Sequence, residues 1–174
     1  MIVQSASSRT PVPWRNGLGV QYEITADGPL PDGWGWRLST ADITTDVAFS
    51  SFPGVQRYFC IGTGNGVVLT IDGVKHHCGP GSITPFRGDA TVDAALIDGP
   101  TCPVNLMVRD GASHRGYHVS TAGMVSTGLV AVALDGGATV SAGADPIELA
   151  PLDAVMCDVE TSFTVLSGSV VIVS

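Results

Sequence analysis

The sequence predicts an all-β protein, and three observations carry that prediction. Twenty-two glycines and eleven prolines interrupt the 174-residue chain too often for an amphipathic helix to continue. Several segments alternate apolar and polar residues with the period of two that is typical of strands. Asp-Gly or Asn-Gly pairs follow many of these segments, and such pairs favour the turns of β-hairpins. Short strands separated by turns at this spacing are typical of a sandwich or a barrel.

Four alternating segments are the clearest predicted strands. In residues 34–43, Trp36 and Leu38 share one face and Arg37 lies on the other, facing either solvent or a barrel cavity. In residues 104–111, Asn105 lies on the face opposite to its valine and leucine neighbours. The segments are "WGWRLSTADI" (34–43), "VVLTIDG" (67–73), "TVDAALIDG" (91–99) and "VNLMVRDG" (104–111).

The stretch "GTGNGV", residues 62–67, is similar to a phosphate-binding loop only in its glycines. Val67 ends it and predicted strands flank it, whereas a dinucleotide-binding loop lies between a strand and a helix. We therefore interpret Asn65-Gly66 as a type I′ hairpin turn.

The chain from about Tyr117 onward echoes the preceding part. The stretches "IDGVKHHCGPGSITP" and "SAGADPIELAPLDAV" align with Gly73 on Gly143, about 70 residues apart, and an alternating strand follows each. This similarity predicts two β-barrel-like halves, the first formed by residues 1–112 and the second by residues 113–174.

Composition narrows the classes of partner. Sixteen acidic residues against eight basic ones give a net charge of −8 without a basic cluster, which argues against a nucleic-acid partner. No apolar run reaches the roughly 20 residues of a membrane helix, and no signal peptide is visible, so we expect no membrane partner and a cytoplasmic location. The four cysteines are widely spaced, and we expect buried free thiols, with disulfides as the alternative. They are Cys60, Cys78, Cys102 and Cys157.

Histidine and cysteine spacing predicts neither a metal site nor a catalytic group. His76 and His77 are adjacent, and adjacent residues on a strand face opposite sides, so only one could join distant ligands. His114 and His118 fall in the expected connection between the halves. A metal ion needs three or four converging ligands, so we expect no metal and no other cofactor. No GxSxG motif and no evident cysteine–histidine pair is present, so no catalytic residue is predicted.

Five blocks, in the same order, resemble the HutD/Ves family and span residues 13–111. They are "PWRNGLGVQYEI", "WGWRLSTADI", "FSSFPGVQRYF", "PFRGD" and "GPTCPVNLMVRDG". The resemblance implies a bicupin of the RmlC-like cupin class, with two β-barrels or jelly rolls in one chain. It also implies an association with bacterial histidine utilisation or stress response, without an established reaction. Leu18 and Pro103 depart from the family pattern, and the His/Glu metal ligands of enzymatic cupins are missing.

The matching blocks predict a pocket. Asn16-Gly17 permits positive φ, so Trp14 can fold back either as a lid over a barrel end or only as a cap on an open hydrophobic end. Seven of the eight basic residues are arginines, which reflects either codon usage or guanidinium groups that hold a carboxylate. Glu23 is expected to pair with one of them. The predicted ligand-binding residues are Trp14, Asn16, Arg37, Arg57 and Asn105.

These observations favour a non-catalytic small-molecule-binding or regulatory protein linked to histidine utilisation. The expected ligand is a small acidic metabolite of the urocanate or formylglutamate class. The alternatives are a cupin-type enzyme, either an isomerase or a metal-dependent enzyme, and a structural or stress-related interaction protein. The sequence leaves the oligomeric state open, a homodimer included.

Overall fold

The computed structural model describes residues 1–113, 115–143 and 145–174, and strands make up most of them. Within those residues there is no α-helix, and the helical segment is the 3-10 turn η1, Ala6–Ser8. The all-β prediction is therefore confirmed. The contacts divide the chain into two units. The large unit begins at Thr10 and ends before Arg115, and the small unit consists of Met1–Arg9 and Arg115–Ser174.

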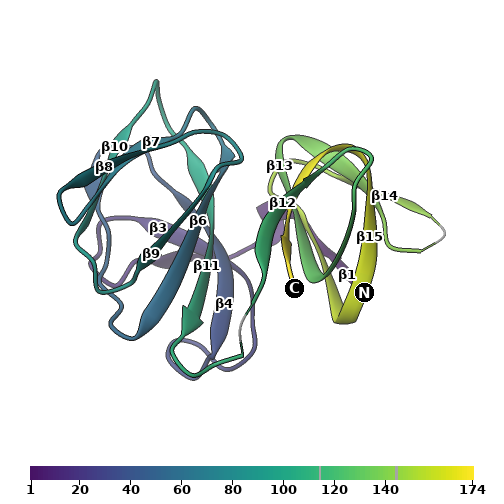
Figure 1. Ribbon diagram of the computed structural model, residues 1–174, viewed down its shortest axis with the longest axis horizontal. Coiled ribbons are helices and arrows are strands. Elements are labelled where there is room, and N and C mark those ends of the chain that lie inside the picture. Colours follow the sequence, from purple (N-terminus) through teal and green to yellow (C-terminus); the bar gives the residue numbers. More distant parts are fainter. Residues whose placement is uncertain (114, 144) are drawn as a thin grey trace. The chain divides into compact units, whose positions relative to one another are not determined.

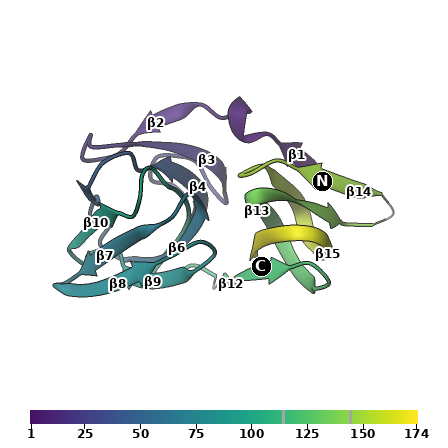
Figure 2. The same ribbon diagram turned by 90° about the horizontal axis from the view of Figure 1, so that it is seen from above.

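The large unit contains two antiparallel sheets that face each other around a common interior (Figures 1 and 2). One sheet has six strands in the order β2-β3-β4-β11-β6-β9, and the other has four in the order β5-β10-β7-β8. The six are β2 (Pro11–Pro13), β3 (Val20–Ala26), β4 (Trp36–Asp42), β11 (Cys102–Arg109), β6 (Val55–Thr63) and β9 (Ile83–Arg87). The four are β5 (Val47–Ala48), β10 (Val92–Leu96), β7 (Val67–Ile71) and β8 (Val74–Cys78).

Apolar side chains from both sheets form the core of the large unit. Phe59 and Ile61 of β6 have no exposed surface, and they cluster with Val67 and Leu69 of β7. Burying one such side chain contributes about 1.5–3 kcal/mol, so this cluster holds the two sheets together. The core occupies one part of the interior, and the functional site described below lies beside it.

The predicted turn at Asp72-Gly73 is confirmed. Both residues have positive φ, 47° and 83°, and they join β7 to β8 with Ile71 opposite Val74. These angles are those of the two-residue turns that match the twist of a hairpin.

The predicted hairpin at Asn65-Gly66 is wrong. The residues connect β6 to β7, which belong to different sheets, and Asn65 is not among the residues with positive φ. The Asn65 side chain instead donates a hydrogen bond to the carbonyl oxygen of Asp98, 3.0 Å away. Gly66, at φ 102°, lies so close to the backbone of Cys78 that a Cβ atom would overlap its carbonyl oxygen. The glycine is therefore required for a close approach between backbones.

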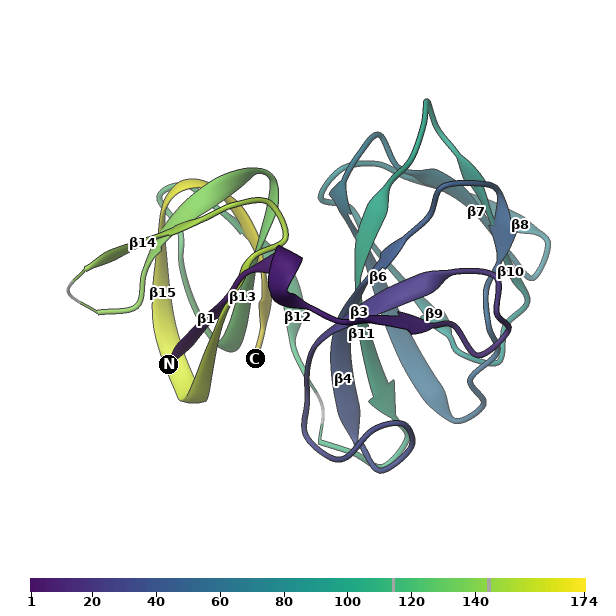
Figure 3. The same cartoon turned by 180° about the vertical axis from the view of Figure 1, so that it is seen from behind.

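The small unit is built around two long, curved strands (Figure 3). Val130 pairs with both Met156 and Val173, so the last strand passes the same residue twice. Phe163 and the valines and alanines around it fill the interior. The strands are β1 (Ile2–Gln4), β12 (Tyr117–Thr121), β13 (Val125–Ser141), β14 (Pro146–Leu149) and β15 (Ala154–Val173).

The first nine residues belong to the small unit and not to the first half, where the sequence had placed them as part of residues 1–112. Strand β1 pairs with β15, with Ile2 opposite Met156. The backbone N–H of Ala6 donates to Asp153 Oδ1 at 2.7 Å, and the Arg9 guanidinium donates to the Leu152 carbonyl at 2.7 Å. The N-terminal segment is thus tied to residues about 150 positions away.

Two further sequence-based expectations concern the second half. His118 was expected in the connection between the two halves, but it lies on β12, opposite Ile172 of β15. Strand β12 pairs with β15 and so belongs to the sheet of the small unit. His114 lies outside the described residues. The aligned Gly73 and Gly143 each follow the first strand of an antiparallel pair, β7–β8 and β13–β14.

The close approach at Gly66 gives a stability prediction. Gly66→Ala is expected to lower the free energy of unfolding by about 2–4 kcal/mol, because alanine disfavours this φ and its Cβ meets the Cys78 carbonyl. Gly73→Ala is the matched control, since it has positive φ in open space, and it should cost about 1 kcal/mol. Chemical denaturation of both variants measures the difference. Equal losses would contradict the steric role of Gly66.

Candidate functional site

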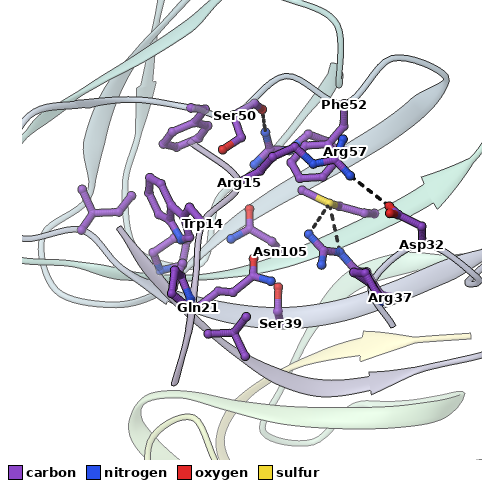
Figure 4. Close-up of a pocket in the computed structure, with 18 residues that line it drawn as sticks. Trp14, Arg15, Gln21, Asp32, Arg37, Ser39, Ser50, Phe52, Arg57 and Asn105 are labelled. Carbon is purple, nitrogen blue, oxygen red and sulfur yellow. Dashed lines mark hydrogen bonds and ion pairs between the residues drawn. The ribbon is translucent and has the colours of Figure 1, made fainter. Parts of the chain in front are cut away.

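A cavity of about 300 Å³ lies within the large unit, bounded by the six-stranded sheet and four connections, one of which contributes Ile43 between β4 and β5. Strands β2, β3, β4 and β11 and residue Arg57 of β6 contribute to its lining (Figure 4). The β2–β3 turn contributes Trp14 and Arg15, the β3–β4 connection contributes Asp32, and the β5–β6 connection contributes Phe52. Polar and aromatic side chains therefore meet at one concave surface, as in typical small-molecule sites.

Strand register places the polar residues in rows. Arg37 of β4 lies opposite Met107 of β11, and Met107 lies opposite Arg57 of β6. In the neighbouring row, Ser39 lies opposite Asn105. Since alternate residues of a strand share a face, these five side chains project from the same face of the sheet and line the cavity. The predicted alternation is confirmed, and Arg37 faces the cavity.

Arg37 is buried, with 5% of its surface exposed, and its acceptors are weak. Its Nε and one terminal nitrogen each lie 3.4 Å from the Met107 sulfur, and thioether sulfur accepts hydrogen bonds poorly. The other terminal nitrogen lies 4.0 Å from a Glu23 carboxylate oxygen. The guanidinium also lies 5.1 Å from the ring centre of Trp34 and 5.3 Å from that of Phe52. Burial lowers the pKa of Arg37, and the Glu23 charge opposes that effect.

Arg57 is buried to the same degree and is surrounded by aromatic rings. Its guanidinium lies 4.9 Å from the Phe86 ring centre, 5.1 Å from that of Phe49 and 5.8 Å from that of Phe52. One terminal nitrogen donates to the Ser50 carbonyl at 3.3 Å, and Nε has no acceptor in the part of the chain that the structure describes. Burial and the nearby Arg37 charge lower the pKa of Arg57 to about 9, which leaves it charged at neutral pH.

Two acceptor groups near the arginines are also incompletely satisfied. The Asn105 side-chain oxygen is buried and receives no hydrogen bond from any described residue. Both Glu23 carboxylate oxygens are also buried, and no described residue donates a hydrogen bond to them. Burial raises the pKa of Glu23 to about 7, and the Arg37 charge opposes the rise. The expected pairing of Glu23 with an arginine is confirmed, with Arg37 as the partner.

Trp14 forms one wall of the cavity because the turn that carries it folds back on itself. The backbone N–H of Trp14 donates to the Gly19 carbonyl, and the Trp14 carbonyl accepts from the Gly17 N–H, both at 2.9 Å. A Cβ atom on Gly19 would lie 2.8 Å from the Trp14 ring, so only glycine lets the ring rest on the backbone there. The ring meets Phe49 edge-on at 5.9 Å. Trp14 thus lines the cavity and also packs against the hydrophobic core.

The structure brings Trp14, Arg37, Arg57 and Asn105 together around the cavity, whereas Asn16 is not among the lining residues. The Asn16 side chain is exposed and bonds to backbone: its nitrogen donates to the Ala48 carbonyl at 3.0 Å, and its oxygen accepts from the Leu18 N–H at 3.1 Å. It holds the turn in shape and fastens it to β5.

Sequence reasoning missed the residues at the mouth of the cavity. Arg15 pairs with Asp32 at 2.9 Å, and Arg109 lies 3.7 Å from the same carboxylate. Phe52 contacts the guanidinium groups of Arg15, Arg37 and Arg57. The "FPG" of the third family block was the one signal for Phe52. Nothing in the sequence linked Asp32 to Arg15, because the long β3–β4 connection brings them together.

Other reactive groups lie away from the cavity. All four cysteines are free, and burial raises the pKa of the Cys60 and Cys102 thiols to about 12, so they stay protonated. His76 and His77 are exposed on β8. Among the described residues, no three His, Cys, Asp or Glu side chains converge as metal ligands. No helix found within the described ranges is long and apolar enough to cross a membrane.

Comparison with solved structures defines the class. The cupin 2 conserved barrel domain protein of Leptotrichia buccalis aligns with 98% of this chain and all of its own, with a TM-score of 0.58 at 10% identity. This likeness establishes the fold alone, and with the two β-barrel units it defines a bicupin. The HutD family model matches residues 6–172, and the chain belongs to the HutD family.

Individual relatives agree with the family. HutD from Pseudomonas fluorescens SBW25, solved in a formate condition, is 30% identical, with a TM-score of 0.80 over 99% of this chain and 97% of its own. An uncharacterized 21.2 kDa protein in the hutC 3' region of Pseudomonas putida is 40% identical over 55% of this chain. Protein Ves of Citrobacter koseri is 35% identical over 55%. The chain spans about half the length of these two curated relatives, 52% and 51%.

The contact between Gly19 and Trp14 can be tested directly. Gly19→Ala is expected to displace the ring and to increase quenching of tryptophan fluorescence by acrylamide, with a loss of about 1–3 kcal/mol of stability. The signal reports Trp14, because Trp34 and Trp36 are 2% and 5% exposed. Gly17→Ala is the control, since its φ is 71° but no atom lies within 4 Å of the added carbon. Unchanged quenching in Gly19→Ala would refute this account of the turn.

Proposed function

We propose that the cavity binds a small acidic metabolite without transforming it, and that the protein is a cytoplasmic regulatory component linked to histidine utilisation. The ligand, and not a nucleic acid or a membrane, is its proposed partner. The observation that carries this proposal is the pair of buried guanidinium groups, Arg37 and Arg57, that face one cavity with weak or missing acceptors.

A carboxylate is the group that such a pair would bind best. Burying a charged group is unfavourable unless hydrogen bonds and an opposite charge compensate it. The Met107 sulfur and a carboxylate 4.0 Å away compensate Arg37 only in part. A ligand carboxylate would replace the sulfur as acceptor and supply a charge-assisted hydrogen bond, which is about twice as strong as a neutral one.

The rest of the lining favours a ligand with a flat or extended body and a hydrogen-bond donor. Trp14, Phe49 and Phe52 offer aromatic surface, and the Asn105 oxygen offers an acceptor. Urocanate combines a carboxylate, a planar body and an imidazole N–H. Formylglutamate combines two carboxylates with an amide N–H. Both are of a size that a cavity of about 300 Å³ accommodates.

One comparison supports the link to histidine utilisation. The Pseudomonas putida relative is described by its position beside hutC. The non-catalytic part of the proposal rests on the lining itself. Asp32 provides the one carboxylate among the described lining residues, and it already forms ion pairs with Arg15 and Arg109.

Calorimetric titration with urocanate and formylglutamate tests the proposal. The wild-type protein is expected to bind at least one of them with micromolar affinity. Arg37→Ala and Arg57→Ala should each weaken binding by more than tenfold, because a hydrogen bond to a charged group contributes about 1.5–3 kcal/mol.

Arg87→Ala is the matched control, since Arg87 lies in the same unit on β9 but pairs with Asp110 at the surface. It should bind as the wild-type protein does. Undiminished affinity in both cavity variants would remove the arginines from the site. Consumption of the ligand during the titration would show that the protein is an enzyme.

A further inference from the structure

We propose that Glu23 is a positioning residue that acts through Arg37, so that binding of a carboxylate in the cavity is accompanied by uptake of a proton by Glu23. This inference rests on the proposed function, because it needs an anion that contacts Arg37. It assigns a role to a side chain that is not among the residues lining the cavity.

The position of Glu23 explains how it reaches Arg37. Glu23 lies on β3 opposite Ser39 of β4, two residues beyond Arg37, and a register shift follows it before Thr25. Such an irregularity re-aims side chains. One Glu23 oxygen then lies 4.0 Å from the Arg37 guanidinium, close enough for charge attraction but too far for a hydrogen bond.

A nearby charge can change the protonation state of Glu23. Its side chain is 19% exposed, and neither carboxylate oxygen receives a hydrogen bond from a described residue. A buried carboxylate without donors favours the protonated form, whereas the adjacent guanidinium favours the ionised form. Burial outweighs the guanidinium and raises the pKa of Glu23 to about 7, so its protonated and ionised forms are in balance near neutral pH.

An anion on Arg37 would upset that balance. A ligand carboxylate placed near the guanidinium adds a negative charge close to Glu23 and so raises the pKa of Glu23 further. A proton moves from solution to one Glu23 oxygen, and the net charge of the site is preserved. The ionised Glu23 carboxylate and the ligand carboxylate thus compete for Arg37. Protonation of Glu23 removes its negative charge and ends that competition.

Other charged groups lie around this pair. Arg37 is the charge that acts on Glu23. Arg15 of the β2–β3 turn, Asp32 of the β3–β4 connection and Arg109 of β11 act on Arg37, and Arg37 in turn acts on Arg57 of β6.

The direction of the pH dependence follows. Below the pKa of free Glu23 the acid is protonated, and the ligand meets an unopposed Arg37. As pH rises above about 7, the free protein loses this proton and affinity falls, until pH passes the higher pKa of the complex. A rise of one unit in that pKa on binding corresponds to a tenfold change in affinity. We therefore expect about tenfold weaker binding at pH 8.5 than at pH 6.

Calorimetry with formylglutamate tests the linkage, because carboxylic acids of this kind titrate at a pKa of about 4 and stay ionised throughout. Titrations at pH 7.5 in phosphate and in Tris, which differ in ionisation enthalpy, should reveal uptake of about half to one proton per ligand. Glu23→Gln should bind with an affinity independent of pH and near that of the wild-type protein at pH 6. Glu148→Gln, an exposed glutamate of the small unit, should keep the wild-type pH dependence.

A second measurement uses the wild-type protein alone, in case Glu23→Gln folds poorly. The chain has three glutamates, so ¹³C labelling of glutamate gives three side-chain carboxyl signals in an NMR spectrum. The Glu23 signal should titrate near neutral pH and shift to a higher pH when formylglutamate is added.

The outcomes separate the inference from the proposed function. Binding without proton uptake and with equal affinity at pH 6 and pH 8.5 would overturn the role of Glu23 and leave the proposed function intact. A Glu23 signal that titrates near the ordinary glutamate pKa of about 4.3 would do the same. Failure of both urocanate and formylglutamate to bind at any pH would contradict the proposed function, and the inference with it.

Discussion

Two guanidinium groups buried on one sheet face are the constraint around which the cavity of this protein is organised. Arg37 and Arg57 are 5% and 7% exposed, and taking such charges out of water costs several kcal/mol each. The surrounding residues offset that cost mainly with aromatic faces. Phe52 contacts both groups, Trp34 contacts Arg37, and Phe49 and Phe86 contact Arg57. Each such contact contributes about 0.5–2 kcal/mol. What the protein does not provide is a strong acceptor for every donor.

The barrel makes this arrangement possible because its strands bring distant residues into register. Arg37, Met107 and Arg57 come from three adjacent strands, and their order across the sheet sets a sulfur between two cations. The apolar core beside the cavity fixes the strands, and Trp14 of the folded-back turn packs against that core and meets Phe49 edge-on. The scaffold therefore holds the arginines in place before any ligand arrives, which reduces the ordering cost of binding.

Sequence patterns predicted the parts of this structure that depend on local periodicity. The alternation in residues 34–43 and 104–111 placed Arg37 and Asn105 on the face opposite the apolar residues, as observed. The family blocks pointed to Arg57 and Trp14. Features that depend on distant contacts could not be read in this way. Strand β1 pairs with β15 because of partners about 150 residues away, and no local pattern encodes them.

The residues that were predicted wrongly also depend on contacts with distant parts of the chain. Asn65-Gly66 has the composition of a hairpin turn, but the next strand joins the other sheet, and the Asn65 side chain bonds to Asp98. Asn16 was grouped with the site because it adjoins Trp14, yet its side chain satisfies backbone groups. Phe52 and Asp32, which complete the cavity, lie on connections whose paths the sequence does not predict. Turn composition indicates a change of direction but not the destination of the chain.

A crystal structure of the protein with urocanate or formylglutamate would show whether the buried arginines form a carboxylate site. We expect a ligand carboxylate over Met107, with an oxygen about 2.7–2.9 Å from a guanidinium nitrogen of Arg37 or Arg57. The Arg37 donors would then be directed to the ligand and away from the sulfur. A ligand bound elsewhere, or a carboxylate that points to solvent while Arg37 keeps its contacts with Met107, would show that the arginines do not form this site.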